Sequence, residues 1–272
     1  MTDKRISVAP MMGMTDRHFR FMASLLCENI SLYTPMIHVD AILQSEKNFL
    51  EKEDCKKIIE KISTMNIERD SKKFNHIGPF LMNYTTKKEK YFDSAEKANE
   101  IFNKIFLSVE NPINKIKTTI SKFFPNYEIS ETKENHRNYS SCTIRRHKKG
   151  KSIPLHKDNV SYEGVEYQVS KINNQLSCIL HLQETEKGGN LSIYNKQWEK
   201  KLEKHREIEF GYNPIVKKNT EADTIKSELG DLVIINPNYL HEVKKIQGNS
   251  DRVTLGIFFG IEDKTKKIFS WA

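Results

Sequence analysis

Apolar residues recur at helical spacing between residues 46 and 135. Residues 51–62, 95–106 and 113–124 each gather Ile, Ala or Phe side chains on one face among Lys, Glu and Asn. Such a face predicts an amphipathic helix that packs one side against a core. Pro125 ends the third segment, because proline cannot continue a helix. The pattern predicts a mainly helical region over residues 46–135.

From residue 140 the pattern changes to short runs of Ile, Val, Leu and Phe. Strands are predicted at residues 141–147, 176–182, 190–194, 231–235 and 253–259. Turn signals separate them, and we expect Gly188-Gly189 to form a hairpin turn rather than to contact a ligand. Helices followed by short strands predict an α+β fold, with a β-sandwich or barrel-like core over residues 140–262 that the helices buttress.

Residues 4–43 show a separate pattern. A short apolar strand at residues 6–9 precedes a turn with Pro10 and Gly13, a helical stretch from Asp16, and a second strand at residues 32–37. This order predicts one β-α-β unit. We therefore divide the chain into an N-terminal part, residues 1–45, and a main domain, residues 46–272.

The composition narrows the class of protein. Only 37% of the 272 residues are hydrophobic, and no apolar run approaches the roughly 20 residues that span a bilayer, so we expect no membrane partner. Fourteen Phe and ten Tyr exclude wholesale disorder. Four cysteines without a CxxC pair, and the lack of a leader at residue 1, predict reduced thiols and a cytoplasmic location. Only nine of the 44 basic residues are Arg, so the net charge of +8 does not by itself indicate nucleic-acid binding.

The residues that carry chemistry are His156, Asp158 and His241. In an extended segment residues i and i+2 point the same way, so His156 and Asp158 converge while Lys157 turns outward. His241 follows the predicted strand at residues 231–235 and reaches the same place from a distance. Two imidazoles and one carboxylate on one face of a metal leave three positions open, which suits Fe(II) oxygen chemistry.

Arg252 lies eleven residues after His241, with Thr254 on the same side of a predicted strand. A guanidinium there can bind a carboxylate through two parallel hydrogen bonds, beside a hydroxyl donor. A dicarboxylate can therefore chelate iron at one end and reach Arg252 at the other. A second His-x-Asp run, residues 38–40, has no His and Arg at such spacing in a strand-rich context, and we do not select it.

At these motifs the chain resembles the Fe(II)/2-oxoglutarate-dependent oxygenases over about residues 46–262. The resemblance rests on FLEKEDCKKIIEKI, on IPLHKDN, and on SELGDLVIINPNYLHEV with DRVTLGIFFG. It implies a double-stranded β-helix core of the jelly-roll or cupin-like kind, with Fe(II) bound by His156, Asp158 and His241. It also implies 2-oxoglutarate as cosubstrate, bound by Arg252 with Thr254, and O2, with ascorbate as a candidate reductant.

Two further segments, KYFDSAEKANEIFNKIF and QLSCILHLQETEKGGNLSIYNKQW, resemble the branch that hydroxylates or halogenates free amino acids. In halogenases of that branch Gly or Ala replaces the ligand carboxylate, and a halide fills the vacancy. Asp158 is present here, so the resemblance implies hydroxylation with release of succinate and CO2. The implied substrate is a small-molecule amino acid, and a basic one such as lysine is the first to test.

Predicted substrate contacts rest on proximity in the sequence. Glu163 and Glu166 are the acids nearest to the metal-ligand candidates and are candidate acceptors for substrate ammonium groups, in a segment that is either a lid or an ordinary surface loop. Trp198 either walls the pocket or packs on the barrel. Arg145 and Arg146 alternate on a predicted strand, so only one of them points inward, and neither is assigned a role.

The N-terminal part resembles another family. ISVAPMMGMTDRHFRFMASLLCENISLYTPMI is similar to the first β-α-β unit of tRNA-dihydrouridine synthases, over about residues 4–43. A TIM barrel needs roughly 200 residues, and the Asn-x-Gly-Cys-Pro segment with that family's catalytic cysteine is absent from this sequence. We therefore predict a non-functional fragment and carry over no flavin or tRNA residues.

Two other functions stay open on the sequence alone. The same cofactors would act on a tRNA or a protein side chain, which the charge of +8 and the N-terminal fragment favour. Alternatively, the chain would be a non-catalytic β-barrel that binds a metal or ligand, against which the intact His156, Asp158, His241 and Arg252 set argues. No feature of the sequence specifies an oligomeric state.

Overall fold

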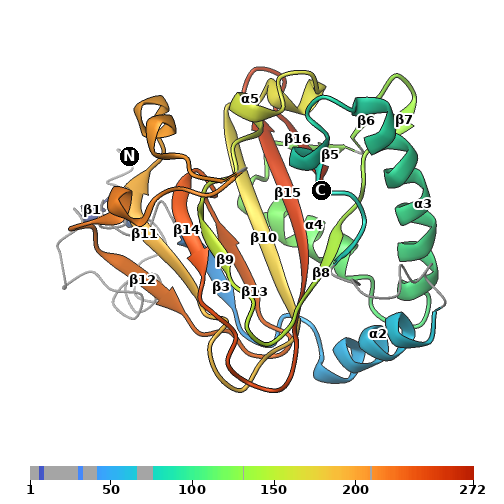
Figure 1. The fold of residues 1–272 in the computed structure, drawn as a ribbon. Coiled ribbons are helices and arrows are strands. Elements are labelled where there is room, and N and C mark those ends of the chain that lie inside the picture. The colour runs from blue at the N-terminus through green and yellow to red at the C-terminus, as the bar shows by residue number, and fades with distance from the viewer. Residues whose placement is uncertain (1–5, 9–29, 33–41, 66–75, 131, 209) are drawn as a thin grey trace.

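The structure, a computed structural model, describes residues 6–8, 30–32, 42–65, 76–130, 132–208 and 210–272. Their core is two β-sheets, with helices along one side of the larger sheet (Figure 1). The larger sheet contains, in order, β3 (Ile42–Glu46), β13 (Leu232–Ile235), β10 (Asn174–Gln183), β15 (Arg252–Glu262), β16 (Lys267–Trp271) and β5 (Glu128–Ser130), with β8 (Thr143–His147) paired to β15 and β4 (His76–Ile77) paired to β8. The smaller sheet has the order β12 (Ala222–Ile225), β11 (Leu191–Gln197), β14 (Tyr239–Val243) and β9 (Ile153–His156), and β6 (Lys133–Glu134) pairs with β7 (Arg137–Asn138) in a two-stranded ribbon.

Alternation along the strands of the larger sheet assigns its two faces. Cys178 and Leu180 of β10 pack with the helices in one hydrophobic cluster, whereas Ile179 packs with the smaller sheet in another. In the pairing of β10 with β15, Ile179 is opposite Gly256 and His181 is opposite Thr254. The face that carries Thr254 is therefore turned toward the smaller sheet, and the space between the sheets is where polar residues gather.

The three predicted surface helices are confirmed as α2 (Lys52–Thr64), α3 (Lys88–Phe106) and α4 (Pro112–Phe123). Helix α3 begins seven residues before the predicted start, because buried Tyr91 and Phe92 extend its apolar face. Helix α4 begins where the side chain of Asn111 accepts hydrogen bonds from two backbone amides. The short helices are α5 (Val160–Glu163) and the 3-10 turns η1 (Leu81–Tyr84), η2 (Gln168–Ser170), η3 (Lys200–His205) and η4 (Pro214–Lys217).

The predicted strands are confirmed as β8, β10, β11, β13 and β15, and the two facing sheets form the double-stranded β-helix that the resemblance implied. The core continues beyond the predicted end at residue 262, because β16 pairs with the second half of β15. The apolar pattern did not predict β9 and β14 as strands, and only their metal-ligand candidates were selected. In β14 the reason is that two of its five residues, His241 and Glu242, are polar.

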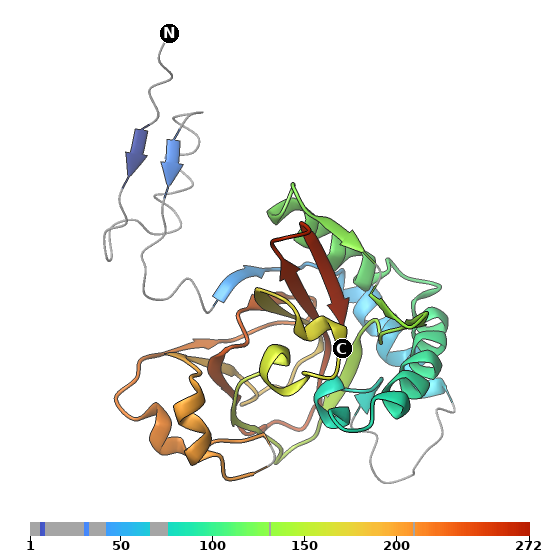
Figure 2. The same ribbon diagram turned by 90° about the horizontal axis from the view of Figure 1, so that it is seen from above.

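The N-terminal strands β1 (Ile6–Val8) and β2 (Ile30–Leu32) pair in parallel as a separate two-stranded sheet, which Figure 2 shows apart from the two larger sheets. The helix predicted from Asp16 lies outside the described residues. Strand β3 crosses the predicted boundary at residue 45 and pairs with β13, with Ser45 opposite Val233. The larger sheet thus includes residues that the pattern assigned to the N-terminal part.

None of the helices in the described ranges is long and apolar enough to cross a membrane. Cys55, Cys142 and Cys178 are buried free thiols, and Cys27 lies outside the described residues. Burial raises the pKa of the Cys55 thiol to about 11, so this cysteine is a core residue and not a nucleophile.

Candidate active site

Three donor groups meet between strands β9 and β14. His156 and His241 are opposite each other in this antiparallel pair, and their ring centroids lie 4.1 Å apart. Asp158 follows β9, where its backbone amide donates to the carbonyl of Pro237 at 2.9 Å. One donor atom from each of the three side chains lies within 4.8 Å of the others, and all three residues are buried. The structure thus brings together the set that the spacing predicted.

Hydrogen bonds orient both imidazoles. Nδ1 of His156 lies 2.8 Å from the carbonyl oxygen of Pro154, and Nδ1 of His241 lies 2.8 Å from that of Tyr239. Because a carbonyl oxygen only accepts, each Nδ1 carries the proton and each Nε2 keeps a free lone pair. Such outer hydrogen bonds are usual for metal-binding histidines. Two imidazoles and one carboxylate fit Fe(II) and leave positions open for other ligands.

The charges at the site match metal binding. Burial, together with the proximity of His241, lowers the pKa of His156 to about 4. Burial alone would raise the pKa of Asp158, but the adjacent imidazoles of His241 and His156 lower it to about 2. At neutral pH His156 is therefore neutral and Asp158 ionised, which are the forms that bind a metal.

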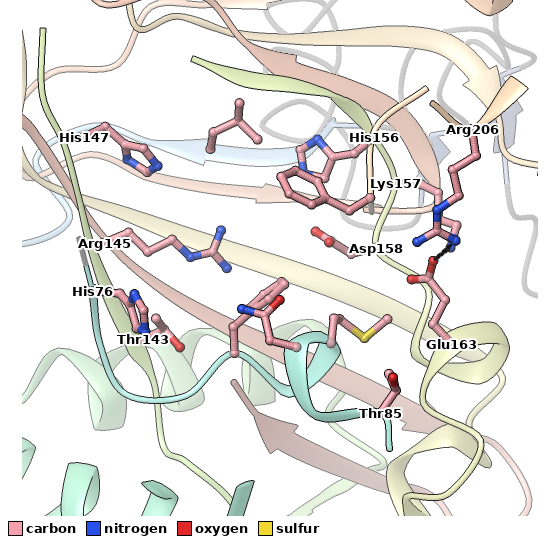
Figure 3. A pocket seen from close by; sticks show the side chains of 15 residues that line it. His76, Thr85, Thr143, Arg145, His147, His156, Lys157, Asp158, Glu163 and Arg206 are labelled. Atoms are coloured by element: carbon pink, nitrogen blue, oxygen red, sulfur yellow. Dashed lines mark ion pairs between the residues drawn. The ribbon is translucent and has the colours of Figure 1, made fainter. Parts of the chain in front are cut away.

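Two cavities meet at these residues. The larger has a volume of about 620 Å3 (Figure 3) and the smaller about 50 Å3. Both are lined by Arg145, His147, Ile153, His156 and Asp158. The metal-ligand candidates therefore lie where a small ligand in one cavity and a larger ligand in the other would approach each other.

Arg252 and Thr254 line the smaller cavity, on the inward face of β15. Nε of the buried Arg252 has no hydrogen-bond partner, and Oε1 of Glu184 lies 3.7 Å from it. Gly189, with a positive φ of 71°, packs on the arginine stem, where an added Cβ would lie 3.2 Å from Cδ of Arg252. An unpartnered buried guanidinium atom in a narrow cavity beside the metal ligands fits the distal carboxylate of 2-oxoglutarate.

A family model described as carrier-protein-independent halogenase WelO5 matches residues 37–272. The chain belongs to this family. Members of this family use Fe(II), 2-oxoglutarate and O2, so the protein is an enzyme of this class, and the described residues include a His-Asp-His set that can hold the iron. This chain differs from the halogenases in its third metal donor. It has the carboxylate of Asp158 at the position where the resemblance described above associates halogenation with Gly or Ala.

Individual proteins similar to this WelO5-family chain differ in how much they share with it. The leucinostatins biosynthesis cluster protein S of Purpureocillium lilacinum is 24% identical over 181 residues, 64% of this chain and 73% of that protein. The crystal structure of an N-substituted L-amino acid dioxygenase from Burkholderia ambifaria AMMD in complex with alpha-KG has the same fold, with a TM-score of 0.54 and 12% identity over 81% of this chain and 83% of that chain.

The resemblance to dihydrouridine synthases is confined to a fragment. The tRNA-dihydrouridine(20/20a) synthase of Shewanella oneidensis is 44% identical over 48 residues, which are 18% of this chain and 14% of that enzyme. The chain thus spans about a seventh of that relative, and no activity follows from the match.

The predicted substrate residues of this WelO5-family protein lie in different places. Glu163 lines the larger cavity, where its carboxylate pairs with Lys157 at 2.7 Å and with Arg206 at 3.1 Å. Glu166 is exposed and is not among the residues that line either cavity. It follows the end of α5, and its side chain lies at the surface. The expected acceptor pair is therefore reduced to Glu163, whose charge is already compensated.

Trp198 lies behind the cavity wall and lines neither cavity. Its Nε1 donates to Glu203 at 2.7 Å, and its ring packs on Tyr162 with centroids 4.5 Å apart. Nζ of Lys157 lies 4.7 Å from the centroid of the Trp198 ring. Lys157 is thus buried between aromatic rings and Glu163 and lines the same cavity as His156 and Asp158. The prediction that it turns outward is wrong, because its ammonium group pairs with Glu163 inside the fold.

Sequence reasoning assigned no role to Arg145, which lines both cavities. Its neighbour Arg146 forms an ion pair with Asp251 at 2.9 Å. His76 and His147 also line the larger cavity, and burial lowers the pKa of both. The strand alternation showed that one arginine points inward, and the pairing of β8 with β15, in which Arg145 is opposite Thr254, decides which.

Proposed function

We propose that this protein hydroxylates an amino acid substrate rather than halogenating it. The observation that carries the proposal is the Asp158 carboxylate, whose Oδ2 lies 3.7 Å from Nε2 of His241. A metal held by three protein ligands keeps three further positions. A chelating 2-oxoglutarate takes two of them and O2 needs the third, so no position remains for a halide.

In this proposal His156, Asp158 and His241 hold the iron, and Arg252 with Thr254 binds the distal carboxylate of 2-oxoglutarate. The unpartnered Nε of Arg252 and the volume of the smaller cavity, about 50 Å3, support the second assignment. Bound iron supplies the oxidation of 2-oxoglutarate to succinate and CO2 together with hydroxylation of a C–H bond. The chain contributes ligand geometry, orientation of the cosubstrate, and a cavity that limits access of water.

The larger cavity is the proposed substrate site. It adjoins Asp158 and His156, and its volume of about 620 Å3 accommodates an amino acid or a derivative of one. A protein with the same fold is named for its action on N-substituted L-amino acids, which favours this class. Lysine, the first candidate from the sequence, needs a carboxylate for its side-chain ammonium, and only Glu163 is present besides Asp158 among the described residues of this cavity.

The test is a panel of free and N-acylated amino acids, incubated with the protein, Fe(II), ascorbate, 2-oxoglutarate and O2 in high chloride. We expect succinate together with a product that has gained one oxygen atom, measured by mass spectrometry. A chlorinated product would contradict the proposal. Turnover stimulated by tRNA or a peptide, and by no member of the panel, would replace it with the macromolecular alternative.

A further inference from the structure

Arg145 is a cation without an ion-pair partner in the wall of the larger cavity. Within the part of the chain that the structure describes, no ion pair or hydrogen bond involves its guanidinium, which lies 4.3 Å from the centroid of the Phe80 ring. Its neighbours across the sheet are Thr254 on β15 and His76 on β4. A partly buried charge of this kind is costly unless an anion compensates it.

Arg145 is the cation of the cavity lining that has no ion-pair partner among the described residues. Among the described lining residues three are cations, namely Arg145, Lys157 and Arg206, and two are carboxylates, Asp158 and Glu163. Lys157 and Arg206 share the carboxylate of Glu163, Arg206 also pairs with Glu203 at 3.2 Å, and Asp158 faces the metal position. Since a bound metal takes the Asp158 carboxylate, that group does not compensate Arg145, whose charge is left for a bound anion.

The remaining lining suits an uncharged group. Phe80, Met82, Ile153 and Phe210 provide apolar surface, and Asn83 and Thr85 provide neutral hydrogen-bonding groups. Figure 3 shows Arg145 and the Glu163–Arg206 pair on opposite sides of the cavity, with Asp158 between them. A molecule anchored at Arg145 would therefore extend past the metal-ligand candidates toward a wall whose charges already compensate each other.

We propose that Arg145 binds the carboxylate of the substrate, and that the cavity selects a monoanion with an uncharged body, such as an N-acylated amino acid, over lysine. This inference rests on the proposed function for the identity of the site. A second ammonium group on the ligand would find no unpaired acid among the described lining residues, whereas an acyl group removes the positive charge of the α-amino group.

The first test measures binding without turnover, by calorimetry on the protein loaded with Ni(II) and 2-oxoglutarate. The probes are N-acetylleucine, leucine, leucinamide and lysine, whose net charges at pH 7 run from −1 to +1. We expect N-acetylleucine to bind at least about tenfold more tightly than leucine, with leucinamide and lysine weaker still. Equal or tighter binding of lysine or leucinamide would overturn the inference.

The second test compares two neighbouring arginines. Arg145→Met should weaken N-acetylleucine binding about 10- to 100-fold, the usual effect of losing a charge-assisted hydrogen bond. Arg146→Met, which leaves the cavity charges unchanged, should bind the probe like the wild type, and Arg145→Lys should recover part of the affinity. If Arg145→Met weakened 2-oxoglutarate binding and not probe binding, Arg145 would be a cosubstrate residue and the proposal would be wrong.

The two proposals fail separately. If N-acetylleucine binds in the expected order but no oxygenated product forms from any carboxylate, the hydroxylase proposal fails while the binding role of Arg145 stands. If lysine is hydroxylated and Arg145→Met turns it over like the wild type, the hydroxylase proposal stands and the role of Arg145 is refuted.

Discussion

The carboxylate of Glu184 lies between Arg252 and His181. Its Oε1 is 3.7 Å from Nε of Arg252 and accepts a hydrogen bond from Nδ1 of His181. Burial, together with the charge of Arg252, lowers the pKa of His181, although Glu184 opposes this shift. Glu184 is thus close enough to orient the guanidinium, and the distance is too long for a hydrogen bond that would occupy Nε.

Glu184→Gln should therefore weaken 2-oxoglutarate binding by roughly three- to tenfold, because a nearby charge no longer orients Arg252. Arg252→Lys should weaken it more, since a lysine cannot form two parallel hydrogen bonds to a carboxylate. Titration of the metal-loaded protein with 2-oxoglutarate measures both, and Glu199→Gln, at an exposed site, is the control. Substrate affinity at saturating 2-oxoglutarate should stay constant in Glu184→Gln, and a parallel loss would indicate general distortion.

His241→Ala should abolish measurable succinate formation and reduce bound iron, because it removes one of three metal donors. Metal content and 2-oxoglutarate turnover are measured on the same preparation. The control is His136→Asn, at an exposed position with a φ of 65° that asparagine tolerates. Normal turnover in the His241 variant would refute the ligand assignment.

The Asp158 carboxylate should keep the wild type a hydroxylase even in high chloride, with no chlorinated product by mass spectrometry. Asp158→Gly removes the donor and opens a position, but we expect mostly lost activity. A halide there would lack hydrogen-bonding support built for it, and such support strongly affects ligand binding at metal sites. Efficient chlorination by this variant would show that the donor alone decides the reaction.

Two N-terminal truncations, one that keeps strand β3 and one that removes it, should differ in stability. Deleting residues 1–36 should preserve iron and 2-oxoglutarate binding, because the proposed ligands and β3 remain. Deleting residues 1–46 removes β3 and exposes the edge of β13, and should lower the melting temperature by about 2–8 °C, as loss of about 1–2 kcal/mol does in a domain of this size. Bound FMN in the full-length protein would contradict the assignment of the N-terminal part as a fragment without function.

Asp231 should stabilise the fold in a pH-dependent way. Burial would raise the pKa of this carboxyl group, but Lys47 and the backbone amides of Glu228 and Asn48 hold it below its ordinary value of 3.8. The stabilisation is therefore present above that pH and is lost as the pH falls through the folded-state pKa. Asp231→Asn should cost about 1–3 kcal/mol of unfolding free energy at pH 7.

Denaturant unfolding between pH 7 and pH 2 measures this difference, which should shrink below about pH 4. Because the Lys47 side chain is 56% exposed, we attribute most of the effect to the two backbone donors. Asp263→Asn, at an exposed position, serves as the control. A cost that stayed constant down to pH 2 would show that the charge of Asp231 does not contribute.

The sequence by itself determined much of the local structure and the chemistry of the metal site. Apolar spacing predicted α2, most of α3, α4 and five strands of the two sheets, because the periods of helix and strand differ and each element buries one face. Spacing also selected His156, Asp158 and His241, since residues i and i+2 of an extended segment point the same way.

Only the tertiary structure decided which groups surround that site. Alternation left Arg145 and Arg146 equivalent, and the pairing of β8 with β15 directs Arg145 into the cavities while Arg146 pairs with Asp251. The sequence offered Glu163 as an acceptor for a substrate ammonium group. In the fold its negative charge is already compensated, because Arg206, 43 residues away, pairs with its carboxylate. The period of a strand specifies which residues share a face, but which face becomes the interior depends on contacts between segments far apart in the chain.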